Sequence, residues 1–216
     1  MYLISLTNAG DRAVLSSEEA ARAARFVFDR DRAHFIAAHS ALRSILAGYL
    51  GEPANALEIG VADKGKPFLS AHPGLRFNLS HSGEYAMVAV AESREVGVDI
   101  ERMRGERPTR DIAERFFAPY EVAALAAEPV DRQIAVFFAI WSRKEAYIKA
   151  RGEGLGIALD SFVVSHGPEG ALLEAEDRER WSMYSLAAPE GYAAALCVEG
   201  SDARVRQIAW PSRRDT

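Results

Sequence analysis

A glutamate lies inside the apolar stripe of the helix that the sequence predicts over residues 130–151. Apolar residues recur there at spacings of three and four, and Glu145 lies only about 40° around the helix from Trp141. An inward charge costs free energy unless it is paired or binds a cation. Two interpretations stay open: Glu145 is a functional carboxylate, or it forms an ion pair with Lys149 one turn later.

Two further carboxylates lie on one face of a predicted strand. The segment GVDIE, residues 97–101, follows the β-rich run EYAMVAVA, and the intervening ESRE predicts a hairpin between the two strands. Because side chains alternate along a strand, Asp99 and Glu101 project to the same side. A bound cation relieves their repulsion, and oxygen ligands suit Mg²⁺ or Mn²⁺. The alternative is an exposed polar face that ends in the basic loop 102–107.

Two motifs upstream carry groups that suit a phosphate. In FNLSHSGEY, residues 77–85, a strand pattern precedes a predicted polar turn that offers hydroxyls, an imidazole and backbone N–H groups. In GKPF, Lys66 lies between a glycine and a proline, which favours a fixed position for its ammonium group, facing a phosphate. Each has an ordinary alternative: His81 as a surface turn histidine, and Lys66 as a turn lysine.

In this order, GKPF, FNLSHSG, GVDIE and WSRKEAYIK followed by GEGL resemble the 4′-phosphopantetheinyl transferases of the Sfp (surfactin-type) class. The matching run covers residues 66–155, the central part of the chain. Three moderately specific motifs in the correct order carry more weight than any single one. The resemblance implies an enzyme that transfers the 4′-phosphopantetheine group of coenzyme A to a serine of an apo acyl, polyketide or peptidyl carrier protein, releasing adenosine 3′,5′-bisphosphate.

The resemblance assigns the metal ligands to Asp99, Glu101 and Glu145, in agreement with the carboxylate faces. The ion is expected to be Mg²⁺, with Mn²⁺ as a substitute, and to contact the pyrophosphate of coenzyme A. A base must also take the proton of the carrier serine. Glu145 is the first candidate because we expect it to be the least exposed carboxylate, and Glu101 is the second.

The resemblance also implies contacts with coenzyme A. Lys149 is expected to neutralise charge on the phosphates, and it forms the family's lysine pair with Lys144. Ser80 and His81 of the SHSG motif are expected to contact a phosphate, and Lys66 to lie at the adenosine-phosphate end.

The N-terminal third departs most from the family. Arg22 and Arg25 are candidates for the 3′-phosphate of coenzyme A, with a solvated helix face as the alternative. Where the family commonly has an arginine in the first helix, a gapless match places His34, which weakens a permanent bidentate phosphate contact. Arg30 or Arg32 is a candidate substitute.

The order of predicted elements indicates an α+β fold formed by a pseudo-twofold duplication, with halves 1–103 and 104–216. The resemblance implies the same fold and an active site at the interface between the halves, where pockets commonly form. The predicted elements are the strands 2–6 and 56–62, the helices 17–28, 31–49, 109–116, 118–127 and 130–151, and the strands in LDSFVV, WSMYSL and GYAAALCV.

The composition of the 216 residues bounds the remaining classes of function. With 49% hydrophobic and 26% charged residues the balance is that of a globular protein, and the net charge of −5 argues against broad nucleic-acid binding. Cys197, the single cysteine, indicates a reducing cytoplasm, and the N-terminus has no signal-peptide or membrane-span pattern. We expect a cytoplasmic monomer with no membrane or nucleic-acid partner. A basic cluster is a candidate carrier-docking patch or a solvated loop: Arg102, Arg104, Arg107 and Arg110.

The main alternative function is a non-catalytic module that binds coenzyme A or a carrier protein, although such a module need not keep three metal ligands. The half-length, trimeric holo-carrier-protein synthases are a second alternative, against which the doubled length argues. A Mg²⁺-dependent phosphohydrolase is a third, and it would not be expected to share this order of motifs.

Overall fold

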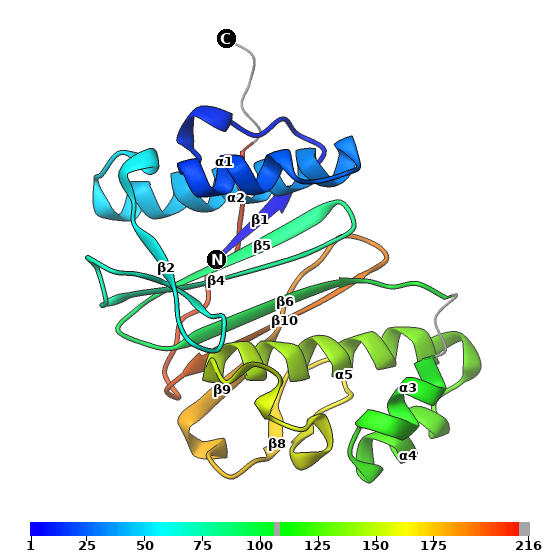
Figure 1. The fold of residues 1–216 in the computed structure, drawn as a ribbon. Helices are drawn as coiled ribbons and strands as arrows, with labels where there is room; N and C mark the ends of the chain where they lie inside the picture. The colour runs from blue at the N-terminus through cyan, green and yellow to red at the C-terminus, as the bar shows by residue number, and fades with distance from the viewer. Residues whose placement is uncertain (106–108, 212–216) are drawn as a thin grey trace.

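Two β-sheets lie between two long helices (Figure 1). The computed structural model describes residues 1–105 and 109–211, apart from the side chain of Leu155. Helix α2 (Asp29–Leu50) packs on one sheet and helix α5 (Val130–Arg151) on the other, so the strands form the middle of the molecule. The predicted α+β class is confirmed. No helix within the described ranges is both long and apolar enough to cross a membrane.

The first sheet has the strand order β11–β1–β5–β4. Its strands are antiparallel except that β11 runs parallel to β1. On the face of this sheet that α2 covers, Phe77, Ala86 and Val88 pack against Leu42 and Leu46 of the helix. The elements up to β5 are β1 (Tyr2–Ser5), η1 (Arg12–Val14), α1 (Ser17–Ala24), α2, η2 (Ala54–Ala56), β2 (Ile59–Val61), β3 (Pro67–Leu69), β4 (Leu75–Ser82) and β5 (Tyr85–Glu92).

The second sheet has the strand order β6–β10–β9 and is covered by α5. A further antiparallel pair, β7 with β8, lies beside it, and the chain then returns to the first sheet as β11. The elements of this part are β6 (Val96–Arg102), α3 (Thr109–Phe116), α4 (Pro119–Ala127), α5, η3 (Gly154–Gly156), η4 (Leu159–Ser161), β7 (Val163–Val164), β8 (Leu172–Glu174), η5 (Arg178–Arg180), β9 (Trp181–Ser185), β10 (Tyr192–Glu199) and β11 (Ile208–Ala209).

Gly97 has no side chain, and this lets α5 lie directly on β6. A Cβ atom at Gly97 would lie 2.1 Å from the carbonyl oxygen of Ala146 and 2.2 Å from the backbone nitrogen of Ala150. Asp99, two residues on, projects to the same face and is paired across the sheet with the small residue Ala195. The α5-facing surface of β6 therefore has room for a carboxylate between helix and sheet.

Polar side chains of β4 take the place of a main-chain ladder beside β6. One edge of β6 pairs with β10, and on the other edge its backbone N–H groups donate to side chains spaced two residues apart on β4. The contacts of this strand-bridging ladder are Val98 N to Asn78 Oδ1 at 2.9 Å, Ile100 N to Ser80 Oγ at 3.4 Å and Arg102 N to Ser82 Oγ at 3.1 Å. The ladder joins the two sheets.

The predicted hairpin between EYAMVAVA and GVDIE is wrong. β5 pairs with β1 and β4, whereas β6 pairs with β10. The reason is that β6 satisfies one edge through β10 and the other through the strand-bridging ladder, which leaves no edge for β5. The SHSG segment is not a turn either, because Ser80, His81 and Ser82 continue β4. The two-residue turn is Gly83 and Glu84, with Gly83 at a φ of 56°.

Several predicted boundaries differ from the structure. Helices α3 and α5 have the predicted bounds, but α1 ends at Ala24, α2 begins at Asp29, and β2 spans only three residues. In LDSFVV a 3₁₀ turn precedes the two-residue strand β7. Helices α2 and α5 each have 22 residues and end at a left-handed glycine, Gly51 and Gly152. The duplication itself stays a prediction.

Lys144 and Glu121 form an ion pair in the core beneath α5. Their side chains are 0% exposed and 2.8 Å apart. Lys144 also donates to the carbonyl oxygens of Leu159 and Phe162, both at 2.7 Å, and Glu121 accepts from the N–H of Val164 at 2.8 Å. Burial lowers the pKa of Lys144, and the negative charge of Glu121 opposes that shift. This lysine therefore ties α5 to α4 and to the segment before β7.

Glu19 ties α1 to α2. It completes a capping box with Ser16, accepts a hydrogen bond from Arg43, and lies 2.9 Å from Nδ1 of His39. Burial alone would raise the pKa of Glu19, but the hydrogen bonds from His39, from the N–H of Ser16 and from Arg43 outweigh it and lower that pKa to about 2.

We expect Gly97→Ala to lower the free energy of unfolding by about 3 kcal/mol, because the added methyl group must push α5 away from β6. Urea titration followed by circular dichroism measures the change. Gly48→Ala is the control, since a Cβ there meets nothing within 4 Å and alanine favours the helix by roughly 0.5–1 kcal/mol. An unchanged midpoint for Gly97→Ala would contradict the close approach.

Replacing Lys144 with methionine should destabilise the fold by roughly 3–5 kcal/mol, because Glu121 is then left as an unpaired buried charge. The exposed Lys64→Met variant should stay within about 0.5 kcal/mol of the wild type. Thermal unfolding of the three proteins, followed by calorimetry, makes the comparison. Equal losses at both positions would show that the buried pair does not stabilise the fold.

Glu19 also predicts an acid dependence of stability. Its pKa is about 2 in the folded protein against an ordinary 4.5, so its stabilisation is present above about pH 4.5 and is lost as the pH falls toward 2. We therefore expect the wild type to exceed Glu19→Gln in free energy of unfolding at pH 6, by a margin that shrinks below pH 4.5. The exposed Glu18→Gln variant should show a much smaller difference at pH 6. A constant margin for Glu19→Gln would contradict the shift.

Candidate active site

Three carboxylates face the space between β6 and α5. Asp99 and Glu101 come from the α5-facing side of β6, and Glu145 comes from the stripe of α5 that also carries Trp141 and Lys149. Burial raises the pKa of Glu145, and the negative charges of Asp99 and Glu101 raise it further, while Lys149 lowers it. Glu145 therefore lies within electrostatic reach of Asp99 and Glu101.

Lys149 acts as the cation of this neighbourhood. Its Nζ donates to Asp99 Oδ1 at 2.6 Å and to Ser80 Oγ at 2.9 Å, and Ser80 Oγ in turn donates to Asp99 Oδ1 at 2.8 Å. Lys149 is 28% exposed, and Asp99 only 2%. The ion pair considered between Glu145 and Lys149 is thus replaced by one between Asp99 and Lys149.

The second oxygen of Asp99 is buried without a hydrogen-bond partner. Asp99 Oδ2 is one of two such side-chain atoms among the described residues. An unpaired carboxylate oxygen at this depth costs free energy unless another ligand satisfies it. A hard cation that prefers oxygen ligands would satisfy this carboxylate oxygen. As the side chains stand, however, no three acidic, histidine or cysteine groups within the described ranges are gathered closely enough to hold a metal ion.

Glu145 is not the least exposed carboxylate, contrary to expectation. Asp99 and Glu121 are fully buried, whereas Glu101 and Glu145 are half-buried. The apolar stripe of a helix does not report how deeply each of its positions is buried once β6 and β10 pack against it. A half-buried carboxylate remains accessible to a substrate proton, and Asp99 does not.

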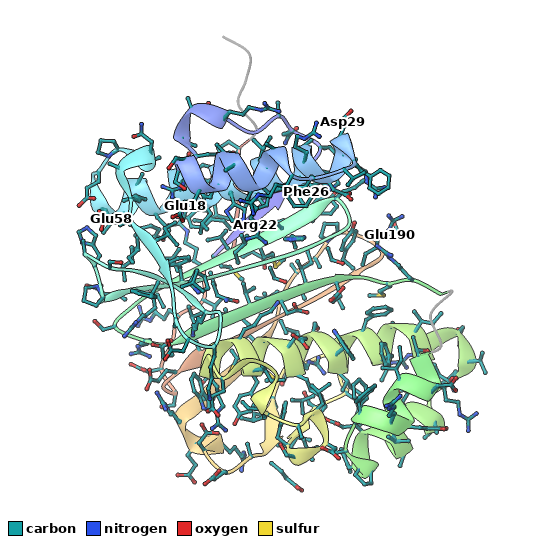
Figure 2. The ribbon with its side chains drawn as sticks, viewed as in Figure 1. Glu18, Arg22, Phe26, Asp29, Glu58 and Glu190 are labelled. Atoms are coloured by element: carbon teal, nitrogen blue, oxygen red, sulfur yellow. The ribbon has the colours of Figure 1, made fainter. Side chains whose placement is uncertain are left out.

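A cavity of about 510 Å³ lies between the α1–α2 layer and the turn that joins β4 to β5. Figure 2 shows Arg22 and Phe26 in that layer near Asp29, which begins α2, with Glu190 on the same side of the molecule. The cavity has both aromatic and charged walls. Its lining residues are Arg22, Phe26, Arg30, Asp31, His34, Phe35, His39, His81, Gly83, Glu84, Arg102 and Arg104.

His81 lines this cavity, and its neighbours Ser80 and Ser82 on β4 donate hydrogen bonds to Asp99 and Glu101. Its side chain is exposed, yet the surrounding protein atoms lower its pKa, and the positive charges of His39, Lys149, His34 and Arg22 lower it further. The same concentration of positive charge favours an anionic ligand. The cavity wall at His81 is therefore next in sequence to the two β4 serines that contact the carboxylates.

The structure separates the N-terminal candidates for phosphate binding. Arg22 lines the cavity, with its guanidinium 5.2 Å from the centre of the Phe35 ring, and so do Arg30 and His34. Arg25 is exposed at the end of α1 and is not among the lining residues. Arg32 donates to the carbonyl oxygen of Phe26 and pairs with Asp29, which occupies its guanidinium.

Lys66 is not among the residues that line this cavity. Its Nζ donates to Glu95 at 2.6 Å and to the carbonyl oxygen of Ala150 at 2.7 Å, beside the glycine that ends α5. Burial lowers the pKa of Lys66, and Glu95 opposes that shift. Within the described ranges the structure therefore does not bring Lys66 to the cavity with His81; it uses the ammonium to tie β3 to the end of α5.

Part of the basic cluster after GVDIE also lies at the cavity. Arg102 and Arg104 line it, whereas Arg110 pairs with Glu114 on the surface of α3. Arg107 lies outside the described residues. The structure thus divides the predicted carrier-docking patch between the cavity wall and a neighbouring helix.

Sequence reasoning missed Asn78, Ser82 and Tyr192. Asn78 and Ser82 belong to the strand-bridging ladder, and the hydroxyl of Tyr192 accepts from the N–H of Glu84 at 3.1 Å. The period-two polar pattern at 78, 80 and 82 is the signal in the sequence, because side chains spaced by two lie on one face of a strand and can bond to a neighbouring strand. Nothing local marks Tyr192.

Two family models together match most of the chain. The model described as "4'-phosphopantetheinyl transferase superfamily" matches residues 95–197. The model described as "4'-phosphopantetheinyl transferase, N-terminal" matches residues 9–93. A solved holo-[acyl-carrier-protein] synthase from Thermotoga maritima aligns with 50% of this chain and 64% of its own, with 22% identity and a TM-score of 0.40.

Curated relatives match over nearly the whole length. The 4'-phosphopantetheinyl transferase HetI of Nostoc sp. is 38% identical over 191 residues, covering 87% of this chain and 80% of HetI. The 4'-phosphopantetheinyl transferase Sfp of Bacillus subtilis is 30% identical over 190 residues, covering 87% of this chain and 84% of Sfp. On this evidence the chain belongs to the 4′-phosphopantetheinyl transferase superfamily and is an Sfp-type transferase.

Proposed function

We propose that this chain transfers the 4′-phosphopantetheine group of coenzyme A to a serine of an apo acyl, polyketide or peptidyl carrier protein. The observation that carries the proposal is the junction of two features: a basic cavity and a cluster of carboxylates that Lys149 only partly neutralises. Membership of the transferase family supports the same reaction.

Coenzyme A suits the cavity in size and charge. A volume of about 510 Å³ lies within the range usual for small-molecule sites. Arg22, Arg30 and His34 are candidates for the 3′-phosphate at the far end, and His81 and Lys149 for the pyrophosphate near the carboxylates. His34 and Arg30 would share the phosphate contact, so the histidine need not carry it alone.

Asp99, Glu101 and Glu145 would hold Mg²⁺, or Mn²⁺ in its place. The unpartnered Asp99 Oδ2 and the like charges that raise the pKa of Glu145 support a cation here. Lys149 would then release Asp99 and contact a phosphate. A bound Mg²⁺ would polarise the phosphoryl oxygens and stabilise charge on the departing bisphosphate.

The protein's own residues position the reactants and receive the proton. The serine oxygen of the carrier forms a bond to the β-phosphorus of coenzyme A, and the bond from that phosphorus to the bridging pyrophosphate oxygen breaks. Adenosine 3′,5′-bisphosphate leaves with the electron pair. Glu145 would take the serine proton, because it is half-buried and its pKa is raised, with Glu101 as the second candidate. Lys149 and His81 would stabilise charge on the phosphates.

We further propose that the chain works as a cytoplasmic monomer and that residues 1–103 and 104–216 are two related halves. The similar lengths and glycine ends of α2 and α5 support the second point. Light scattering coupled to size exclusion would test the first.

Transfer can be measured directly as the intact mass of an apo carrier protein incubated with this chain, coenzyme A and Mg²⁺. We expect the carrier to gain the mass of one phosphopantetheine, and to gain nothing when EDTA is present. If coenzyme A binds but no carrier type is modified, the chain is a binding module instead.

The same assay tests the carboxylates. Asp99→Asn and Glu145→Gln should each slow transfer on the order of 100-fold or more, because each removes a charge that would hold the cation. Glu58→Gln is the matched control: it is exposed, lies far from Asp29 and Glu190 in Figure 2, and should keep the wild-type rate. Circular dichroism checks that every variant is folded. A variant at 99 or 145 with near-normal rates would remove that residue from the site.

A further inference from the structure

Ser82 stands between a fixed backbone group and a carboxylate of the site. Its Oγ accepts from the N–H of Arg102 at 3.1 Å and donates to Oε2 of Glu101 at 2.9 Å. We propose that Ser82 is a positioning residue that holds the Glu101 carboxylate toward α5. The proposal rests on the proposed function, because it concerns how the carboxylate is presented to a cation and to coenzyme A.

The donor and acceptor roles of Ser82 are settled by chemistry. A backbone N–H can only donate, so the contact from Arg102 uses a lone pair of Oγ and leaves the hydroxyl hydrogen for another acceptor. Glu101, as a carboxylate, can only accept. The hydroxyl is therefore oriented by β6 itself, and it aims its hydrogen at a side chain one residue away on the same strand.

The three members of the strand-bridging ladder differ in whether they also contact a carboxylate. All three of its side chains accept from β6, at the N–H groups of Val98, Ile100 and Arg102. Ser80 and Ser82 each add a bond to a carboxylate, Ser80 to Asp99 and Ser82 to Glu101. Asn78 makes the bridging contact at the buried end of the ladder, where its amide oxygen meets the N–H of Val98. Asn78 therefore makes the same kind of bridging contact as Ser82, but at the other end of the ladder from Glu101.

The end of β4 is itself held in place, which makes it a firm support. Gly83 begins the turn, and a Cβ there would lie 2.4 Å from the hydroxyl oxygen of Tyr192. That hydroxyl accepts from the N–H of Glu84, and Tyr192 pairs with Arg102 in the neighbouring sheet. Ser82 is thus connected to β6 directly through the N–H of Arg102, and the turn after it is connected to β6 through Tyr192.

Groups that orient a metal-binding carboxylate commonly change metal affinity or activity by 10–100-fold when removed. Ser82→Val and Ser82→Thr are the decisive pair, because the two side chains have nearly the same shape and differ in the hydroxyl. We expect Ser82→Val to raise the Mn²⁺ dissociation constant about 10–100-fold and Ser82→Thr to stay near the wild type. Electron paramagnetic resonance of free Mn²⁺, with coenzyme A present, gives this constant without any turnover.

Asn78→Ala is the matched structural control. It removes a strand-bridging contact and should lower the unfolding temperature. The Mn²⁺ dissociation constant should change less than about threefold, since the contact of Asn78 is with the N–H of Val98 and not with a carboxylate. If Ser82→Val equals Ser82→Thr in Mn²⁺ affinity, Ser82 does not position Glu101. If Asn78→Ala weakens Mn²⁺ binding as much as Ser82→Val, the effect belongs to strand spacing and the proposal is wrong.

Carrier modification by the wild type separates this proposal from the proposed function. A wild type that neither binds Mn²⁺ nor modifies a carrier overturns both. A wild type that modifies the carrier, with Ser82→Val equal to it in Mn²⁺ affinity, overturns the positioning role alone. Modification by the wild type, with weakened Mn²⁺ binding in Ser82→Val and recovery in Ser82→Thr, supports both.

Discussion

The structure depends on how β6 is held between its two neighbours. β10 supplies main-chain partners on one edge, and Asn78, Ser80 and Ser82 supply side-chain partners on the other. A side chain spans more distance than a backbone ladder, so two sheets can meet here without merging into one. The face of β6 at the seam then carries Asp99 and Glu101 beneath α5, and the glycine at 97 lets the helix lie close enough to add its own carboxylate and lysine.

Charge compensation explains the rest of the site. Lys149 pairs with Asp99, and among the described residues the second oxygen of Asp99 is buried without a hydrogen-bond partner. The cavity beyond His81 has the opposite character, since arginines and histidines dominate its lining. A cation at the carboxylates and a polyanion in the cavity would each relieve an imbalance, and coenzyme A with Mg²⁺ supplies both. The buried pair of Lys144 with Glu121 is separate from this and serves the core.

Local patterns predicted part of this from sequence. The bounds of α3 and α5 follow from apolar spacing, and the shared face of Asp99 and Glu101 follows from strand alternation. Pairing partners did not follow, because β6 meets β10 through long-range packing and meets β4 through side chains, neither of which a hairpin pattern reports. The exposure of Glu145 did not follow either, because a helical wheel shows a stripe but not how deeply the sheet buries each position of it. Lys66 sits in a motif that fits a phosphate, yet Glu95 and the end of α5 take its ammonium.

We propose that a cation takes the place of Lys149 among the carboxylates when coenzyme A is bound. A crystal structure of the protein with coenzyme A and Mn²⁺, with anomalous data at the manganese edge, would test this exchange. We expect one anomalous peak bounded by Asp99, Glu101 and Glu145, with the Lys149 ammonium moved from Asp99 to a phosphate. A bound coenzyme A with Lys149 still on Asp99, or a manganese peak away from these carboxylates, would contradict it.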